Sequence, residues 1–516
     1  MNVAVVVDGS ALQPAQVLAV ARGAARVAVA ESVAPRMAAV RRVVEGALDS
    51  EQVVYGVTTG FGALADTVVP PDQAAALQHA LVRSHAAGVG PAVDDEVVRA
   101  MTVLRARTLA AGHSGVRAEV VDAMAAALNA GLRPLVPLHG SLGASGDLAP
   151  MAHVAAALTG EGWVVSDDGA HADAAPALEL AGLQPLALSV KEGLALLNAT
   201  EGMLACLILA CADLAMLADT ADVVCALSVE ALLGTDRPFA DRLQKLRPHP
   251  GQARSAQNLR TLLDGSGILA SHRHSRHAVQ DAYSLRCAPQ VHGAARDALD
   301  WGETVRDREL QSVVDNPVVF DDGSVESTGN FHGEPLAFAL DLLAIAAAEL
   351  GSISERRTDR LLDPARSHGL PPFLAPEAGL NSGFMLAQYT AASLVAENRR
   401  LAAPASADSI PTSGMQEDHV SMGWSAGMKL RTVVRNLQSI LAIEALVAAA
   451  GLELRLDLLH EQDAGVTASD RTAAVLDRIR SVVQPMRRDR FLAADIDSMR
   501  ALVADGALVA AADLGA

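Results

Sequence analysis

Four long stretches of the chain are rich in Ala and Leu and contain no interior proline. They cover residues 191–234, 335–362, 383–401 and 415–456. Proline strongly interrupts helices, and an uninterrupted helix of about 30 to 40 residues is roughly 45–60 Å long. The stretches therefore predict a mainly α protein with a bundle of long helices, buried against other subunits because one monomer could hardly cover them. A helical solenoid is the structural alternative, but no self-similar repeat of about 30–50 residues is present.

The composition favours the same fold class. Hydrophobic residues make up 51% of the 516 residues and aromatic residues only 3%, so the apolar content is mostly Ala, Leu and Val. Such a chain favours closely packed helices over aromatic-rich β architecture. The net charge of −19 argues against nucleic-acid binding. We expect two regions: residues 1–200, with a glycine-rich turn, and residues 201–516, with the long helices and further site loops.

The ends and the cysteines bear on location. The first ten residues lack a basic start and reach an acid at Asp8, which is not the pattern of a signal peptide. The best charge-free apolar run, residues 202–212, is too short to cross a membrane. Three of the four cysteines lie in one apolar helical stretch without C-x-x-C spacing, where they resemble small buried hydrophobes. We expect a cytoplasmic protein with no membrane partner.

The glycine-rich stretch Gly140–Pro150 has the most specific chemistry in the sequence. The nitrogen of Gly146 has no flanking side chain, so in a tight turn it can approach the carbonyl carbon of Ala144. Attack there with loss of two waters, one of them from Ser145, closes a five-membered electrophilic ring with an exocyclic methylene. Asp147 is expected to be the N-cap of the following helix, whose positive end would face the ring.

This eleven-residue stretch resembles the signature of the ammonia-lyases that use the 4-methylidene-imidazol-5-one (MIO) prosthetic group. The resemblance implies an MIO formed from Ala144, Ser145 and Gly146, with no metal or nucleotide cofactor. It also implies a mainly α homotetramer whose active sites combine loops from three subunits. Similar motifs are spread from about residue 50 to residue 425.

Two motifs before the turn fit this family. Residues 53–62 contain three glycines and form a predicted loop that carries Tyr55, which resembles the family's proposed base. Residues 77–88 are a predicted helix ending at a glycine and containing Ser84 and His85. A histidine near a helix C-terminus is usually a charge-compensating surface residue, but in this family the Ser-His pair goes with histidine as the substrate. The resemblance thus implies that His85 holds the substrate imidazole.

The motifs after the turn supply the other expected site residues. By resemblance, Asn198 donates to the MIO carbonyl, although Ala199 stands where the family usually has glycine. Arg286 offers a planar fork for a substrate carboxylate, whereas an isolated arginine would as often be a structural ion pair. The remaining roles are also implied by resemblance. Gln280 and Tyr283 shape the MIO pocket, Phe331 lies over it, Asn330 lies near the substrate carboxylate, and Glu417 binds the imidazole or handles protons.

Together these residues predict a carbon–nitrogen lyase that converts L-histidine to trans-urocanate and ammonia. The alternatives within the fold are a tyrosine or phenylalanine ammonia-lyase or an aminomutase. From another class, the chain could be a catalytically silent helical scaffold, which would predict loss of an essential residue. Residues 271–277 contain three histidines that could suggest a zinc hydrolase. Interleaved arginines would repel a divalent ion and no Cys or Asp completes a ligand set, so we expect no metal there.

Overall fold

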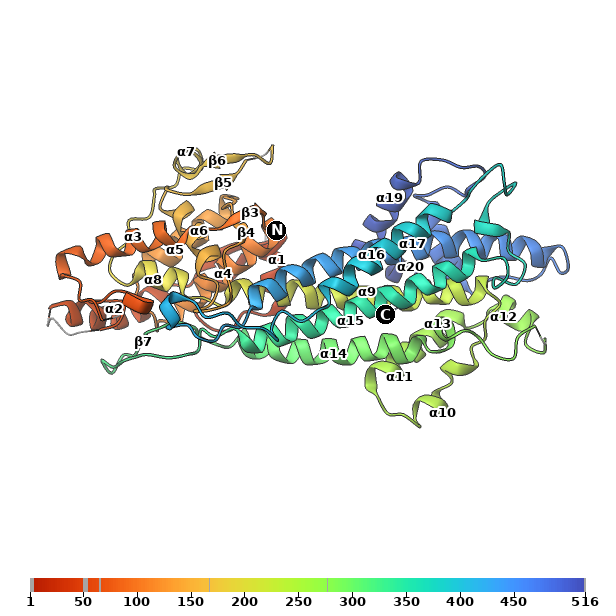
Figure 1. Cartoon of the computed structure of the whole chain (residues 1–516), viewed down its shortest axis with the longest axis horizontal. Helices are drawn as coiled ribbons and strands as arrows, with labels where there is room; N and C mark the ends of the chain where they lie inside the picture. The colour runs from red at the N-terminus through yellow and green to blue at the C-terminus, as the bar shows by residue number, and fades with distance from the viewer. Residues whose placement is uncertain (1–3, 50–53, 65, 167, 276, 515–516) are drawn as a thin grey trace. The chain divides into compact units, whose positions relative to one another are not determined.

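The computed structural model describes residues 4–49, 54–64, 66–166, 168–275 and 277–514 (Figure 1). It is 59% helical with 7% strand, which confirms the mainly α prediction. Its contacts form two compact units. The first contains Met1–Leu209, Glu303–Asp341 and Pro404–Met428, and the second contains Ala210–Gly302, Leu342–Ala403 and Lys429–Ala516. Each unit is made of three separate segments of the chain. The predicted regions 1–200 and 201–516 were defined by their motifs and not by contacts, so that division stays a prediction.

The first unit contains short helices and four two-stranded pairings. Its helices are α1 (Pro14–Ala21), α2 (Val33–Asp49), α3 (Ala74–His85), α4 (Asp95–Ala110), α5 (Ala118–Asn129), α6 (Leu148–Leu158), α7 (Ala174–Leu180) and α8 (Glu192–Leu197). The strands β1 (Ala4–Val7) and β2 (Arg26–Val29) pair in parallel. The antiparallel pairs are β3 (Val89–Ala92) with β4 (Pro137–His139), β5 (Trp163–Val165) with β6 (His171–Asp173), and β7 (Val318–Val319) with β8 (Val325–Glu326).

The described residues of the second unit form helices and connecting segments, with no strand. It contains α10 (Asp241–Gln244), α11 (Pro250–Leu263), α12 (Gly267–Ser271), α13 (Tyr283–Arg286), α16 (Met385–Leu401), α18 (Asp470–Arg480), α19 (Leu492–Ala504) and α20 (Ala507–Ala511). Four longer helices contribute residues to both units: α9 (Glu201–Ala231), α14 (Ala288–Glu309), α15 (Glu334–Leu362) and α17 (Gly423–His460).

The long-helix prediction was right in kind and wrong at two boundaries. The stretch 191–234 is not one helix, because the chain leaves helical geometry at Asn198 and α9 begins only at Glu201. The stretch 415–456 becomes helical at Gly423, since the preceding residues form a loop that contains Glu417. Both errors fall where the chain carries predicted site residues.

Among the described residues, three helical segments are long and apolar enough to cross a membrane, by length and composition alone. They are Glu192–Ala231, Glu334–Leu362 and Gly423–His460. Within the protein, 78%, 61% and 78% of their most apolar windows are buried, so contacts with other parts of the chain account for most of this apolar surface. The expectation of no membrane partner stays a prediction.

Buried charges fix the segments around α8 in the first unit. The fully buried Arg105 side chain of α4 donates to the carbonyl of Val314 at 2.8 Å and to Glu201 Oε1 at 3.1 Å. Its Nε donates to the carbonyl of Ala195 at 2.7 Å. Just before α8, Lys191 Nζ pairs with Asp315 Oδ2 at 2.9 Å, and both side chains are buried. These contacts hold α8, the start of α9 and the segment near residue 315 together.

Candidate active site

The Ala144–Gly146 turn is a strained, tightly enclosed piece of backbone. Ser145 has φ +51° and Gly146 has φ +79°, both in the left-handed region that residues with a side chain rarely adopt. A Cβ on Gly146 would lie 2.0 Å from the carbonyl oxygen of Ala199, so only glycine fits there. The next amide, that of Asp147, donates to the same oxygen at 2.6 Å. Residues 144–146 are thus held in a sharp turn against the chain that follows α8.

Asp147 stands at the N-cap position of α6, but its side chain does not cap that helix. Its Oδ2 instead accepts from the amide of Met203 at 3.0 Å, in the first turn of α9. The prediction that the Asp147 side chain caps α6 was therefore wrong, because its partner is an amide of α9. The side chain is fully buried and meets backbone amides rather than a cation, and burial raises the pKa of Asp147 to about 7.

A cavity of about 600 Å³ in the first unit brings together five of the predicted site residues. Tyr55, His85, Ser145, Asn198 and Glu417 all line it. Much of the remaining wall is apolar and is formed by Phe61, Leu64, Leu77, Leu81, Leu148, Leu194 and Leu197. The polar groups therefore face a largely apolar enclosure, the usual character of a small-molecule site.

Glu417 lies directly beside the turn. Its Oε1 accepts from the hydroxyl of Ser145 at 3.2 Å, and its Oε2 accepts from the hydroxyl of Thr412 at 3.0 Å. The backbones of Thr412 and Glu417 also pair, with N–O distances of 2.9 and 3.3 Å. This pairing fixes the direction of the Glu417 side chain in a segment without regular secondary structure.

His85 and Tyr55 are each held by a neighbouring group. His85 Nδ1 lies 3.1 Å from the hydroxyl of Ser84 at the end of α3. Burial lowers the pKa of His85, while the Glu417 carboxylate opposes that shift. The phenol oxygen of Tyr55 accepts from the amide of Gly62 at 3.2 Å, and its ring meets that of Phe61 edge-on at 6.4 Å. The glycine-rich segment thus positions the tyrosine, as the loop prediction implied.

Asn198 carries an unused polar atom next to the reactive turn. Its Nδ2 donates to the carbonyl of Asn316 at 3.2 Å. Its Oδ1 is buried and has no hydrogen-bond partner among the described residues. Buried amide oxygens are rarely left unpaired, so this one marks a place where a further polar group is expected.

Apart from Ala144 and Gly146, which flank Ser145 in the turn, five predicted residues are not among those lining this cavity. Gln280, Tyr283 and Arg286 belong to the second unit, where Gln280 lines a separate hollow of about 120 Å³. The Arg286 guanidinium stacks on the Tyr283 ring at 4.5 Å, and Tyr283 is 71% exposed. In the first unit, Asn330 is exposed and Phe331 half-buried. The roles predicted for these five residues stay predictions.

The three histidines of residues 271–277 do not offer an obvious ligand set. The ring nitrogens of His272 lie 2.8 Å from the carbonyl oxygens of Ile268 and Gly234. His277 Nε2 lies 3.0 Å from the carbonyl of Leu233. A ring nitrogen that donates to a carbonyl is not available to a metal, and the absence of a metal at this loop stays a prediction.

Some site residues could not be found from the sequence alone. Thr412 orients Glu417 through a pairing that no motif indicates. Asn316 lines the cavity, and its carbonyl accepts from Asn198, although its sequence context, Asp-Asn-Pro, indicates no more than a turn. The Asp-Asn-Pro triplet at 315–317 was the one available signal. Phe61 was noted in its motif without a role.

The Ala144–Gly146 turn fits the formation of an MIO ring from the chain itself. The strained φ values, the contact that excludes any side chain at Gly146 and the exposure of Ser145 to the cavity all suit cyclisation. The unpaired oxygen of Asn198 and the first turns of α6 and α9 add polar groups beside it.

Comparison with known proteins agrees with this geometry. Residues 12–481 match the family model described as aromatic amino acid lyase. The chain is 54% identical over 510 residues to a histidine ammonia-lyase from Streptomyces avermitilis, covering 99% of this chain and 98% of the relative. The solved structure of histidine ammonia-lyase from Trypanosoma cruzi superposes with a TM-score of 0.89 at 41% identity, covering 99% and 95% of the two chains. Tyrosine aminomutase from Streptomyces globisporus gives 0.90 at 38% identity, covering 99% and 98%. The chain belongs to the aromatic amino acid lyase family, which is known for the MIO group.

Proposed function

We propose that this protein is a histidine ammonia-lyase that converts L-histidine to trans-urocanate and ammonia. The activity is that of a carbon–nitrogen lyase, in keeping with the family and with the names of its relatives. One observation carries the choice of substrate: His85 and Glu417 line the same largely apolar cavity as Ser145. An imidazole and a carboxylate are suited to a substrate that itself carries an imidazole.

The electrophile in this proposal is an MIO made from Ala144, Ser145 and Gly146. When formed, it supplies the electron-poor centre that makes loss of ammonia from an amino acid feasible. Its formation removes the Ser145 hydroxyl, so Glu417 Oε1 loses a donor at 3.2 Å and becomes free to accept from the substrate. The amide of Asp147 holds the turn through its bond to the carbonyl of Ala199, and the unpaired Oδ1 of Asn198 is free to meet a further polar group beside it.

The proposed reaction breaks one C–N bond and one C–H bond. The β-proton passes to Tyr55, the C–H electron pair forms the double bond, and the amine leaves with the C–N pair. The amide of Gly62 donates to the Tyr55 oxygen at 3.2 Å and would stabilise the phenolate that takes the proton. His85 and Glu417 meanwhile hold the imidazole, and burial favours the neutral ring of His85.

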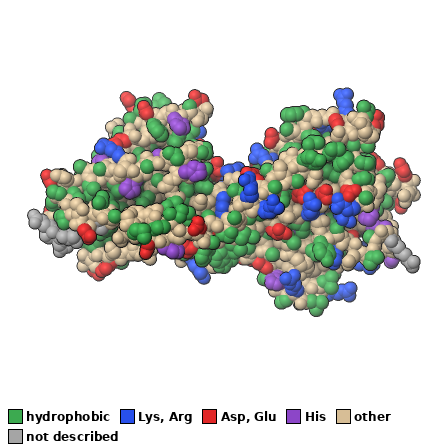
Figure 2. Space-filling model, in the orientation of Figure 1, with side chains coloured by type: hydrophobic (Ala, Val, Ile, Leu, Met, Phe, Trp, Pro, Cys, Tyr) green, Lys and Arg blue, Asp and Glu red, His purple; other side chains and the backbone are tan. Residues whose placement is uncertain are grey.

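We further propose a homotetramer in which another subunit supplies Tyr283 and Arg286. Exposed apolar side chains support assembly: Phe338, Leu342 and Ile345 lie three or four residues apart on α15 and are 51%, 37% and 45% exposed. This spacing puts them on one side of the helix. Figure 2 shows apolar side chains among charged ones over the face drawn. Tyr283, at 71% exposed, is available to a neighbouring chain.

The test is turnover of purified protein with L-histidine, L-tyrosine and L-phenylalanine, followed by near-ultraviolet absorbance of the conjugated acid. We expect a product from histidine. Turnover of tyrosine alone would favour the aminomutase or tyrosine-lyase alternative. The similarity to the structure of a tyrosine aminomutase supports that alternative. Absence of product from all three would contradict the proposal.

Two variants separate the electrophile from the pocket. Ser145→Ala should abolish nearly all turnover, and the intact chain should no longer show the mass loss of about 36 Da expected for two waters. Glu417→Gln should keep that mass loss and severely reduce histidine turnover. Substantial activity in Ser145→Ala would contradict the MIO proposal, and an unaffected rate in Glu417→Gln would remove its proposed role.

A further inference from the structure

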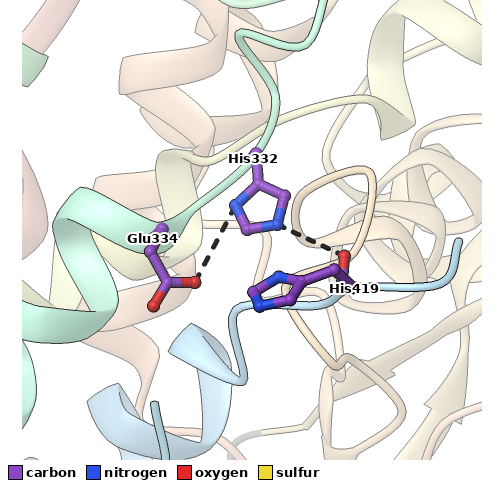
Figure 3. A group of neighbouring side chains, drawn as sticks. All are labelled: His332, Glu334 and His419. Atoms are coloured by element: carbon purple, nitrogen blue, oxygen red, sulfur yellow. Dashed lines mark hydrogen bonds and ion pairs between the residues drawn. The ribbon is translucent and has the colours of Figure 1, made fainter. Parts of the chain in front are cut away.

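A cluster of three potential ligands lies outside the cavity, in the first unit. Figure 3 shows His332, Glu334 and His419, which come from the loop before α15, its first residue and the loop before α17. One ligand atom from each lies within 4.8 Å of the other two. The rings of His332 and His419 are 5.7 Å apart and inclined at 31°. No part of the proposed reaction uses these side chains.

The hydrogen bonding leaves two electron-rich atoms facing each other. His332 Nε2 lies 3.3 Å from the carbonyl oxygen of His419, so in the neutral ring it carries the hydrogen and donates it. His332 Nδ1 then presents its lone pair toward Glu334 Oε2 at 4.0 Å. That oxygen is buried, and no described residue donates a hydrogen bond to it. Something positive between the two atoms would satisfy both.

We propose that His332, Glu334 and His419 bind a divalent transition-metal ion. Two imidazoles and one carboxylate are a ligand set suited to zinc and its neighbours, rather than to calcium or magnesium, which prefer oxygen ligands. Metal–ligand bonds of about 2.0–2.2 Å require the ligand atoms to draw slightly closer than their present spacing. Water can complete the coordination, because His419 is exposed.

The hydrogen bond from His332 to the carbonyl of His419 would also orient the His332 ring for metal binding. Ligating histidines usually donate their other ring nitrogen to a carbonyl or carboxylate, which fixes the ring and leaves the lone pair for the metal. Here the carbonyl belongs to another ligand of the same site. The arrangement therefore exists before any metal is bound.

A metal at this site would also stabilise the segment that contacts the backbone just before the reactive turn. Two residues after His419, the hydroxyl of Ser421 donates to the carbonyl of Gly143 at 3.2 Å. The amide of Met422 donates to the carbonyl of Leu142 at 2.7 Å. A metal that ties His419 to His332 and Glu334 would hold this segment, and with it the backbone leading into Ala144. Its role in this proposal is structural, apart from the chemistry of the cavity.

This site lies elsewhere than the 271–277 histidines, for which the sequence argued against metal, and it departs from the expectation of a metal-free protein. The competing occupant is a proton on His332 Nδ1, which would pair the imidazolium with Glu334. A metal and a proton make opposite predictions for binding measurements at neutral pH.

The experiment uses the full-length protein without a histidine tag, stripped with a chelator and dialysed against Zn²⁺ at micromolar concentration. We expect one zinc per chain by elemental analysis, together with a raised melting temperature, because a ligand of the native state stabilises it. Co²⁺ in place of zinc should give the visible absorption of a nitrogen-ligated ion. No uptake by the wild-type protein would overturn the proposal and leave the proton as the occupant.

Variants locate the ion. His332→Asn and Glu334→Gln should weaken zinc binding by about tenfold or more. The matched control is His249→Asn, an exposed histidine 3.6 Å from one carboxylate, that of Asp297, and it should bind zinc as the wild type does. His85→Asn should also keep the zinc, and loss there would place the ion in the cavity and overturn the proposal. Circular dichroism of each variant separates lost binding from lost folding, and a folded His332→Asn with unchanged affinity would also overturn it.

Discussion

Two fully buried aspartates, one in each unit, show how differently a buried carboxyl group can be partnered. Asp222, in α9 of the second unit, has side-chain hydrogen-bond partners on both of its oxygens: a histidine and a hydroxyl on one, and an arginine and an amide on the other. Asp147, beside the reactive turn of the first unit, has only backbone amides on one oxygen and no hydrogen-bond partner for the other among the described residues. Burial is the same in both cases, so the neighbours decide the charge.

In the second unit, both oxygens of Asp222 have hydrogen-bond partners. Asp222 Oδ1 accepts from His292 at 2.7 Å and from Ser255, and Oδ2 accepts from Arg296 at 2.6 Å and Asn258 at 2.9 Å. Although burial opposes ionisation, these partners lower the pKa of Asp222. A carboxylate held in this way stabilises one packing arrangement of the helices and offers nothing to a ligand.

Glu444 of α17 repeats this pattern. Arg357 donates to both of its oxygens, at 2.5 and 2.8 Å. Ser228 and Ser354 add donors at 2.8 and 2.6 Å. The first unit instead leaves Asn198 Oδ1 unpaired and keeps Ser145 at a positive φ. In these examples an unpaired atom and a strained residue lie where chemistry is proposed, and the two saturated carboxylates lie between packed helices.

The largest expected effect comes from breaking the saturated pair. Asp222→Asn would remove the buried carboxylate that His292 and Arg296 share and leave Arg296 with Asp219 alone, at 2.8 Å. Removing one partner of a buried ion pair costs about 3–5 kcal/mol. We expect a clear fall in melting temperature and in the urea midpoint at pH 7. The control is Asp241→Asn, an exposed carboxylate paired with Lys245, which should melt as the wild type does. Equal behaviour of the two variants would contradict the contrast drawn here.

At Asp147, by contrast with Asp222, we expect the ionised carboxylate to make the folded protein less stable. Its folded pKa of about 7 lies above the ordinary value of 3.8, so the folded state holds the proton more tightly. Stability should therefore fall as pH rises from about 4 to 7 and stay level above that, with a total cost on the order of 2–4 kcal/mol. Asp147→Asn carries no such proton, and its melting temperature should change less over this window. A wild-type profile in the variant would show that Asp147 is ionised throughout.

The local features of the site could be predicted from the sequence, whereas contacts between residues far apart in the chain could not. The Gly140–Pro150 stretch predicted a tight turn because the need for glycine at a positive φ is a local requirement. Tyr55 and His85 were likewise placed by their own loop and helix end. The capping of α9 by Asp147 was missed, since a carboxyl before a helix equally suits that helix and one across the fold. The break at Asn198 was also missed, because apolar residues on both sides continue the helical pattern.

A smaller effect is expected where one hydrogen bond orients a proposed catalytic group. Thr412→Val removes the hydroxyl that donates to Glu417 Oε2 at 3.0 Å and keeps the side-chain shape. Loss of about 1 kcal/mol should lower kcat/KM for histidine roughly fivefold. Thr412→Ser should restore most of the activity, because it returns the donor. If both variants turn over histidine equally, the hydroxyl does not position Glu417.

The smallest effect concerns His85, whose pKa burial lowers. Below about pH 6.5, His85 binds a proton more readily in the unfolded chain than in the folded protein. This residue therefore makes the protein less stable as pH falls toward 5. His85→Asn should lose slightly less stability over that range, by about 1–2 °C in melting temperature. Glu417→Gln should have the opposite effect, because it removes the carboxylate that favours the charged ring. The two variants thus test whether the imidazole and the carboxylate act on each other across the cavity, and shifts in the same direction would contradict that coupling.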